Sequence, residues 1–284
     1  MTDFHLVDVF GQSPCSGNPL PVIVAADAIS GKEMSGDEMQ RITRWFGHSE
    51  TAFLLSPTDP AADYRVRIFT LDRELPFAGH PTLGACHAWL ASGGTPRHDR
   101  TIIQQCGAGL IDIRRSGDEL AFAAPPLLRS GSVDPADIDR IATFLSVDPS
   151  AILDSQWVDN GPGWVAIMLG SADEVLSLTP PPSWPERIEL GVVGAHPPGN
   201  VAAYEVRSFF SGANREIIED PITGSLNASL AQWLIGSGRF NAPYLATQGT
   251  ALGRHGRVSI DRDGDRIWVG GHTVSIATGS TILA

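Results

Sequence analysis

The chain has 284 residues, of which 42% are hydrophobic and 18% are charged. This composition is typical of a globular protein with enough apolar residues for two domain cores. Its formal net charge is −12 and its basic residues are scattered singly or in pairs, so we expect neither a nucleic acid nor a membrane as a partner.

The N-terminal segment MTDFHLVDVF has neither the basic start nor the continuous apolar stretch of a secretory signal. No window approaches 18 uninterrupted apolar residues, so no membrane span is predicted. Cys15, Cys86 and Cys106 are an odd number of cysteines at unrelated spacings, which suits a reducing compartment better than a disulfide framework. We therefore expect a cytoplasmic protein.

The first helix is predicted over SGDEMQRITRWFG, which begins with a capping box at Ser35 and Glu38 and ends at Gly47. The apolar strand TAFLL follows, with Ser49 and Glu50 at the junction. Burying an ionised carboxylate costs several kcal/mol unless it is paired or its pKa shifts. Glu50 is therefore either a solvated residue at the end of a strand or a residue that the protein uses.

Two segments further along contain no Asp, Glu, Lys or Arg. They are PTLGACHAWLASGG (residues 81–94) and GSLNASLAQWLIGSG (residues 224–238). A helix without a charged face is buried all round, and each of these is followed by alternating strands that read as a hairpin, the first with its turn at Gly117-Asp118. The pattern predicts an α+β fold in which a sheet is wrapped around each helix.

The two charge-free segments belong to an internal repeat. Five pairs of segments match in the same order, at offsets that drift from 140 to 147 residues; the clearest are YRVRIF with YEVRSF and AWLASGG with QWLIGSG. Such drift is what small loop insertions produce. We predict two homologous, pseudo-symmetric halves, each a β-barrel around a central helix. They cover residues 1–126 and 127–284, and we allow for the extreme C-terminal strand to return to the first half.

Three places carry candidate functional residues, and two of them open the charge-free helices. Ser49-Glu50 is the first, and Gly79-His80 in FAGHPT is the second. Asp220 in EDPITGS, followed by Gly224 and Ser225, is the third. Helix N-termini present free N–H groups that suit an anionic group such as a carboxylate.

Each place also has a purely structural interpretation. Glu50 could be solvated, His80 could only satisfy the start of a helix, and Asp220 before Pro221 is a good helix N-cap. At the repeat offset of 142, Ala78 corresponds to Asp220. No acid in the second half clearly mirrors Glu50, and this asymmetry favours a function for it.

The segments GNPLPVIV, HSETAFL, ELPFAGHPTLGA, EDPITGS and QGTALGRHGRVSI together resemble the PhzF-like phenazine biosynthesis family, over nearly the whole chain. The resemblance implies the diaminopimelate epimerase fold, two β-barrels each around a helix. Related racemases and epimerases use two cysteines, one at each central helix. The matching positions here are Ala78 and Asp220, and Cys86 lies about two turns into its helix, so a two-thiol mechanism is not expected.

The resemblance implies an isomerase, similar to dihydro-3-hydroxyanthranilate isomerase, in which Glu50 takes a proton from one carbon and returns it to another. A raised pKa would suit Glu50 to this exchange. By the same resemblance, His80 and Asp220 bind or orient the substrate or assist the proton. Ser49, Gly79, Gly224 and Ser225 bind its carboxylate. The expected partner is a small cyclic or amino-acid-like carboxylate, with no cofactor, no metal and a homodimer as the assembly considered.

Other functions are weaker matches. A non-catalytic small-molecule binder of the same fold, or an epimerase of divergent mechanism, stays open. A hydrolase is disfavoured because GHSET lacks the second glycine of a nucleophile elbow. Nucleotide binding is disfavoured because GAGLID is a truncated glycine motif in a hairpin.

Overall fold

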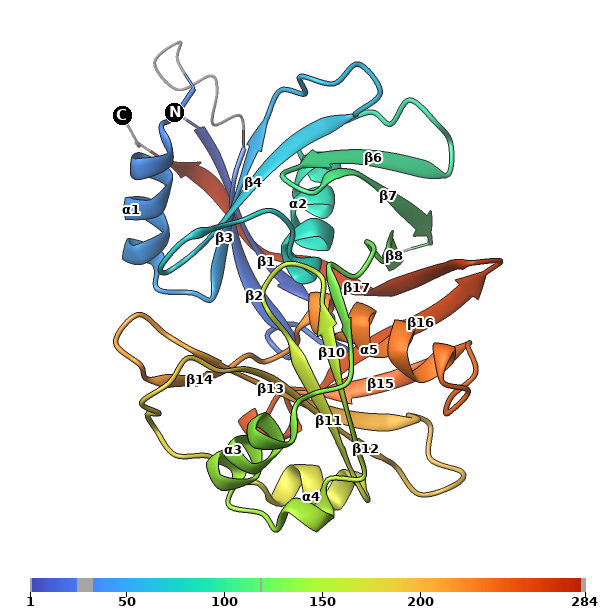
Figure 1. Ribbon diagram of the computed structural model, residues 1–284. Coiled ribbons are helices and arrows are strands. Elements are labelled where there is room, and N and C mark those ends of the chain that lie inside the picture. Colours follow the sequence, from blue (N-terminus) through green and yellow to red (C-terminus); the bar gives the residue numbers. More distant parts are fainter. Residues whose placement is uncertain (1, 25–32, 118, 282–284) are drawn as a thin grey trace. The chain divides into compact units, whose positions relative to one another are not determined.

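The computed structural model describes residues 2–24, 33–117 and 119–281 and is an α+β fold (Figure 1). It divides into two compact units. Unit 1 comprises Met1–Ala123 and Gly270–Ala284, and unit 2 comprises Ala124–Val269. The sequence placed the junction after residue 126. The chain passes from unit 2 back into unit 1 within its last strand, β17 (Arg266–Thr281).

Unit 1 is a closed barrel. Its strands before β17 are β1 (Thr2–Val9), β2 (Asn18–Ile23), β3 (Glu50–Leu55), β4 (Tyr64–Thr70), β5 (Glu74–Leu75), β6 (Thr101–Cys106), β7 (Gly109–Ser116) and β8 (Glu119–Ala123). They pair in the order β1-β2-β3-β4-β6-β7-β8-β17, and β17 pairs again with β1, which closes the ring. The short β5 pairs with β4.

The helix α2 (Gly79–Ala91) lies inside this barrel (Figure 1). It contacts β1, β2, β3, β4, β6 and β8, and every residue from its start to Cys86 is buried. The predicted burial is confirmed for this part of the helix, where residues without charged side chains find apolar contacts on all sides; Ala91, at the end of the helix, is exposed. The outer helix α1 (Gly36–Phe46) has the predicted capping box and ends at a left-handed Gly47.

Unit 2 wraps a second sheet around a second helix, α5 (Gly224–Gly236), which is also buried along most of its length. Its strands are β9 (Arg129–Gly131), β10 (Asp154–Asp159), β11 (Val165–Leu169), β12 (Glu189–Ala195), β13 (Tyr204–Ser211), β14 (Ile217–Glu219), β15 (Tyr244–Gln248) and β16 (Gly256–Asp263). They pair in the order β9-β10-β11-β12-β13-β15-β16-β17, and β14 pairs with β13. Two further helices are α3 (Pro135–Leu145) and α4 (Ala172–Ser177).

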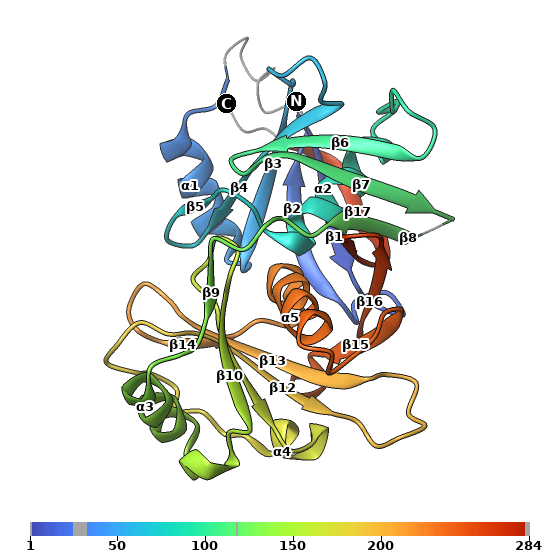
Figure 2. The same ribbon diagram turned by 45° about the vertical axis from the view of Figure 1, so that its right-hand side comes forward.

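Alternation along β12 explains how helices cover both faces of this sheet. Leu190 and Val192 belong to the apolar cluster that contains α3. Gly191 faces the other way, where an added Cβ would lie 2.5 Å from Leu226 of α5. Successive residues of a strand point to opposite faces, and Figure 2 shows α3 and α4 on one side of these strands and α5 on the other.

The two units each have a hydrogen bond between a strand glutamine and the central helix, with donor and acceptor exchanged. In unit 1, Gln104 at β6 donates to Thr82 on α2 (2.9 Å). In unit 2, Gln248 at β15 accepts from Asn227 on α5 (2.8 Å). Both glutamines are buried, and each ties a strand to the central helix of its unit. The predicted pseudo-symmetry is therefore confirmed in polar contacts as well as in fold; Asp118, at the tip of the predicted hairpin, lies outside the described residues.

Within the described ranges, no helix combines the length and the apolarity that are needed to cross a bilayer.

A glycine on β12 gives a test of this packing. A Cβ at Gly194 would lie 2.2 Å from the backbone oxygen of Ser171, at the start of α4, and a backbone atom cannot move aside cheaply. We expect Gly194→Ala to lower the free energy of unfolding by about 1–3 kcal/mol. Gly236→Ala is the control, because nothing lies within 4 Å of its Cβ. Equal urea midpoints for the two variants would contradict the packing described.

Candidate active site

Glu50 begins β3, and its side chain is 14% exposed. The five residues that follow it in the strand are all buried. Glu50 lies opposite Thr70 of β4 in the antiparallel pairing. Of the two sequence interpretations, the solvated carboxylate at a strand end is therefore wrong. The carboxylate is held in a largely water-excluded place.

His80 is the second residue of α2 and is 2% exposed. Its Nε2 lies 3.7 Å from Oε2 of Glu50, and its Nδ1 lies 3.3 Å from Nδ2 of Asn18. The amide nitrogen of Asn18 can only donate, so Nδ1 of a neutral ring is the acceptor and the ring proton is on Nε2. This tautomer directs the N–H of His80 toward the carboxylate of Glu50.

Burial, and to a smaller extent the nearby His48, lower the pKa of His80 to about 3. The imidazole is therefore neutral at neutral pH. A neutral ring can donate or accept one hydrogen bond at each nitrogen, but it supplies no positive charge to the carboxylate beside it.

A buried carboxylate fixes the loop that leads into Asn18, the first residue of β2. Asp8 on β1 is 2% exposed. Its two oxygens accept the backbone N–H groups of Ser16 (3.1 Å) and Gly17 (2.9 and 3.1 Å). Gly17 directly precedes Asn18, and a Cβ there would lie 2.3 Å from the backbone oxygen of Val9. Asp8 therefore positions Asn18, and through it the ring of His80.

Sequence reasoning missed both Asn18 and Asp8 as parts of this site. The available signal was the motif SGNP, in which a polar residue lies between a glycine and a proline at the start of an apolar strand. Such a residue needs a partner when it is buried.

In unit 2, Asp220 is 4% exposed and lies just before α5. Its Oδ2 accepts a hydrogen bond from the hydroxyl of Thr223 (2.6 Å). The amide nitrogen of Gln248 donates to that hydroxyl (2.9 Å), and Ser208 lies 2.6 Å from it. Since the Thr223 hydroxyl has one proton and gives it to Asp220, Ser208 is the donor to Thr223.

The interpretation of Asp220 as the helix N-cap is wrong. The N-cap of α5 is Thr223, and it makes no side-chain capping bond because its hydroxyl is used by Asp220. Ala78, the N-cap of α2, makes none either. The two caps are 145 residues apart rather than 142, so Ala78 corresponds to Thr223 by helix position.

The remaining predicted binding residues lie at the starts of the same elements. Ser49 is half-buried and directly precedes β3, and Gly79 is the buried first residue of α2. Gly224 is the first residue of α5. Ser225 follows it, and its hydroxyl accepts a hydrogen bond from the indole of Trp164 (3.1 Å). Glu50, His80, Ser49 and Gly79 thus belong to unit 1, and Asp220, Gly224 and Ser225 belong to unit 2.

The thiols are poorly placed for acid–base chemistry. Burial raises the pKa of Cys86 to about 12, so its thiolate is scarce at neutral pH. Burial also raises the pKa of Cys106. Neither helix cap is a cysteine. Within the described part of the chain, no group of three or more His, Cys, Asp or Glu side chains is arranged to hold a metal ion.

Known proteins resemble this chain over its whole length. A family model described as phenazine biosynthesis-like protein matches residues 7–279. Antisense-enhancing sequence 1 of Schizosaccharomyces pombe is 32% identical, over 99% of this chain and 98% of its own. Trans-2,3-dihydro-3-hydroxyanthranilate isomerase of Pseudomonas fluorescens is 29% identical over 100% of both chains. An uncharacterized isomerase of Pasteurella multocida is 30% identical over 99% and 94%.

Solved structures share the fold. A PhzF-family phenazine biosynthesis protein of Bacillus anthracis superposes with a TM-score of 0.78, at 20% identity over 99% of both chains. A predicted epimerase of Pseudomonas aeruginosa gives 0.78, at 24% identity over 100% of both chains. A hydroxyproline epimerase of Agrobacterium vitis gives 0.60, at 12% identity over 98% of this chain and 91% of its own.

The buried ring of His80 predicts a specific pH dependence of stability. Because its pKa is lower in the folded chain than the usual 6.5, the unfolded chain binds a proton below pH 6.5 that the folded chain does not. The stability advantage of the wild type over His80→Asn should therefore shrink by about 1.4 kcal/mol per pH unit as the pH falls from 6.5 toward 4. Urea unfolding at several pH values measures this, and the exposed His98→Asn is the matched control. A constant difference between wild type and His80→Asn would show that His80 is not buried neutral.

Asp8 gives a second test. In Asp8→Asn one carboxylate oxygen becomes an NH₂ group that faces backbone N–H donors, so the loop loses acceptors in a buried place. We expect a loss of about 1–3 kcal/mol in the free energy of unfolding. The exposed Asp3 lies on the same strand, and Asp3→Asn should change stability little. Similar unfolding curves for the two variants would contradict the role assigned to Asp8.

Proposed function

The chain belongs to the phenazine biosynthesis-like family, and from this premise we propose that it moves a proton between two carbons of a small carboxylate by acid–base catalysis through Glu50. Relatives over the whole chain are named isomerases, and the chain is an isomerase by this kinship. The proposal concerns the finer points: the residue that carries the proton, the residues that bind, and the class of substrate.

The observation that carries the proposal is the position of Glu50 beside a neutral, buried His80. A carboxylate beside a cation is a weak base, because the cation stabilises its ionised form. His80 is neutral and its Nε2 lies 3.7 Å from the Glu50 carboxylate, so a neutral N–H donor rather than a cation stands beside Glu50. This arrangement suits a group that must accept a proton and then release it.

The chemistry needs one carboxylate and an activated C–H bond. Glu50 takes the proton from carbon, the electron pair of that bond moves into the neighbouring π-system, and the protonated Glu50 returns a proton to a different carbon of the same molecule. Atoms and electrons balance without an added reductant or oxidant, since substrate and product are isomers. The N–H of His80 would hold either Glu50 or a polar group of the substrate during the transfer.

Each unit by itself offers a place suited to a carboxylate. Asp220 is kept in one orientation by the Thr223 hydroxyl, and the uncapped start of α5 at Gly224 and Ser225 offers N–H groups suited to a carboxylate. Gly79 at the uncapped start of α2, and Ser49 beside Glu50, have the same role in unit 1.

The substrate class is inferred from the relatives. The Pseudomonas fluorescens relative is named for trans-2,3-dihydro-3-hydroxyanthranilate, a cyclic amino acid, and we propose a ring carboxylate of this kind for the present chain. That compound is therefore the first probe of activity.

Glu50→Gln tests the proposal, because it keeps the shape of the side chain and removes its ability to carry a proton. With trans-2,3-dihydro-3-hydroxyanthranilate as the probe, we expect the rate to fall by about 10² to 10⁴-fold. Glu74→Gln is the control, since Glu74 pairs with Arg67 in an exposed place. Equal rates for the two variants would contradict the role of Glu50. Binding of the probe without turnover by the wild type would favour the non-catalytic binder.

A further inference from the structure

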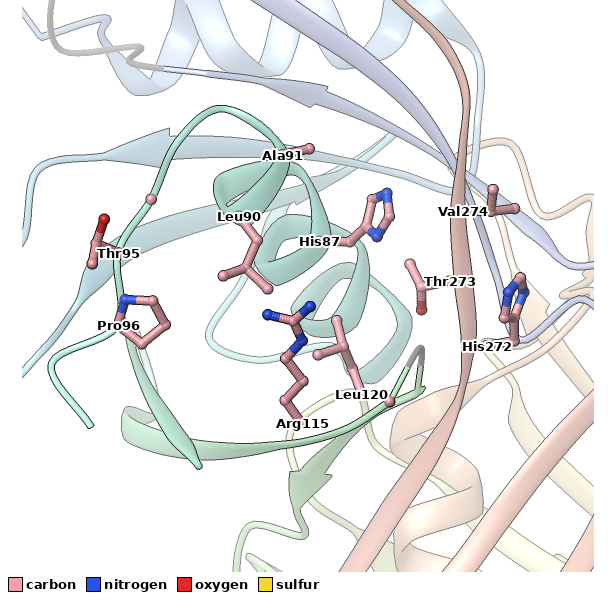
Figure 3. A pocket seen from close by; sticks show the side chains of 12 residues that line it. His87, Leu90, Ala91, Thr95, Pro96, Arg115, Leu120, His272, Thr273 and Val274 are labelled. Carbon is pink, nitrogen blue, oxygen red and sulfur yellow. The ribbon is translucent and has the colours of Figure 1, made fainter. Parts of the chain in front are cut away.

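A groove of about 570 Å³ opens in unit 1, away from the residues proposed for catalysis. It is formed by the C-terminal half of α2, the segment that follows α2, the β7–β8 hairpin and the part of β17 that belongs to unit 1 (Figure 3). None of the residues assigned above to proton transfer or substrate binding lines it. His87, which does, is seven residues, or about two turns, beyond His80 on α2.

Among the described residues that line the groove, Arg115 carries a fixed positive charge, while burial lowers the pKa of His87. Arg115, His87 and His272 line it, and no Asp or Glu among the described residues does. Figure 3 shows Arg115 extending from β7 into the groove, toward the end of α2 that carries His87. The described residues provide no ion pair or hydrogen bond for its guanidinium. Arg115 is exposed in the groove, so its guanidinium is accessible to a ligand.

The register of β7 places Arg115 on an unusual face. Ile111 and Ile113 are buried in the barrel, and residues two apart on a strand share a face. Arg115 therefore follows two core residues, on the side of the strand that faces α2. Its neighbour Arg114 falls on the opposite face.

A buried hydroxyl strengthens the site. Thr273 is 4% exposed and lines the groove, yet its Oγ1 has no hydrogen-bond partner among the described residues. A buried hydroxyl without a partner is costly. The oxygen itself has almost no exposed surface, so a hydrogen bond to a ligand in the groove requires the Thr273 side chain to turn toward it. The Nε2 of His87 already bonds to the hydroxyl of Ser275 (3.0 Å), which leaves its Nδ1 for a ligand.

Apart from Thr95, the rest of the lining is apolar, with Leu90, Pro96, Leu120 and Val274 contributing side chains. A volume of this size is within the range of small-molecule sites, which combine apolar walls with a few polar groups. The planar guanidinium of Arg115 matches a carboxylate through two parallel hydrogen bonds. We propose that this groove is a second binding site, specific for a small organic carboxylate with an apolar body, whose anionic group binds Arg115 and Thr273.

The probe for this site is benzoate, with binding followed by NMR of the imidazole nitrogens of the full-length protein. We expect saturable shifts of the His87 and His272 signals, with the His80 signals unchanged at the same occupancy. Arg115→Gln should weaken benzoate binding at least about tenfold, and Thr273→Val about threefold or more. Arg114→Gln, on the opposite face of β7, is the matched control and should bind as the wild type does.

Three results would overturn the proposal. One is benzoate binding that Arg115→Gln and Thr273→Val leave unchanged. Another is a perturbation confined to His80, which would place benzoate at the proposed reaction site instead. The third is equal binding of inorganic phosphate, which would mean that the apolar walls recognise nothing. If Arg115→Gln does not fold, benzoate binding by Thr273→Val and the shifts of the wild-type histidine signals still test the proposed site. The outcome is independent of the reaction proposed for Glu50.

Discussion

The structure depends on satisfying polar groups that are buried against two helices without charged side chains. A central helix that is apolar all round must be enclosed by its sheet, and the strands that enclose it bring backbone and side-chain polar groups out of water. Gln104 and Gln248 satisfy such groups in the two units, the first as a donor and the second as an acceptor, and each joins a strand to the central helix of its unit. The two halves of the repeat therefore share a strand-to-helix hydrogen bond as well as a pattern of apolar residues.

The same constraint prepares the candidate site. His80 is neutral because it is buried, and its tautomer is set by Asn18, whose loop is held by the carboxylate of Asp8. In unit 2 the hydroxyl of Thr223 donates a hydrogen bond to Asp220 and does not cap α5, which begins at the next residue. In each unit the central helix begins without a side-chain cap, beside a carboxylate or imidazole that is held in place by other polar groups. Such preorganisation favours chemistry, because little reorganisation is left for the moment of reaction.

Much of this was predictable from local pattern. The repeat, the capping box at Ser35, the burial of both central helices and the position of Glu50 at the start of a strand all follow from spacing and composition. The positions of Asn18 and Asp8 do not, since they depend on a loop in which Phe10 and Cys15 adopt left-handed backbone angles. The N-cap of α5 was misplaced because Asp-Pro is an ordinary N-cap signal. Only the tertiary structure shows that the Asp220 carboxylate accepts a hydrogen bond from Thr223 instead. The groove could not be predicted either, because two of its lining residues, Arg115 and Thr273, are more than 150 residues apart in the sequence.

The central claim is that Glu50 carries the proton, and isotope exchange in D₂O tests it most directly. Wild type and Glu50→Gln are each incubated in D₂O with trans-2,3-dihydro-3-hydroxyanthranilate, and carbon-bound deuterium in substrate and product is followed by NMR while binding is measured in parallel. The account predicts that the wild type isomerises the compound. The hydrogen that is added to the new carbon comes from the protonated Glu50 side chain. It predicts that Glu50→Gln binds the compound but catalyses neither isomerisation nor exchange at carbon. Exchange or isomerisation by Glu50→Gln at the rate of the wild type would contradict it.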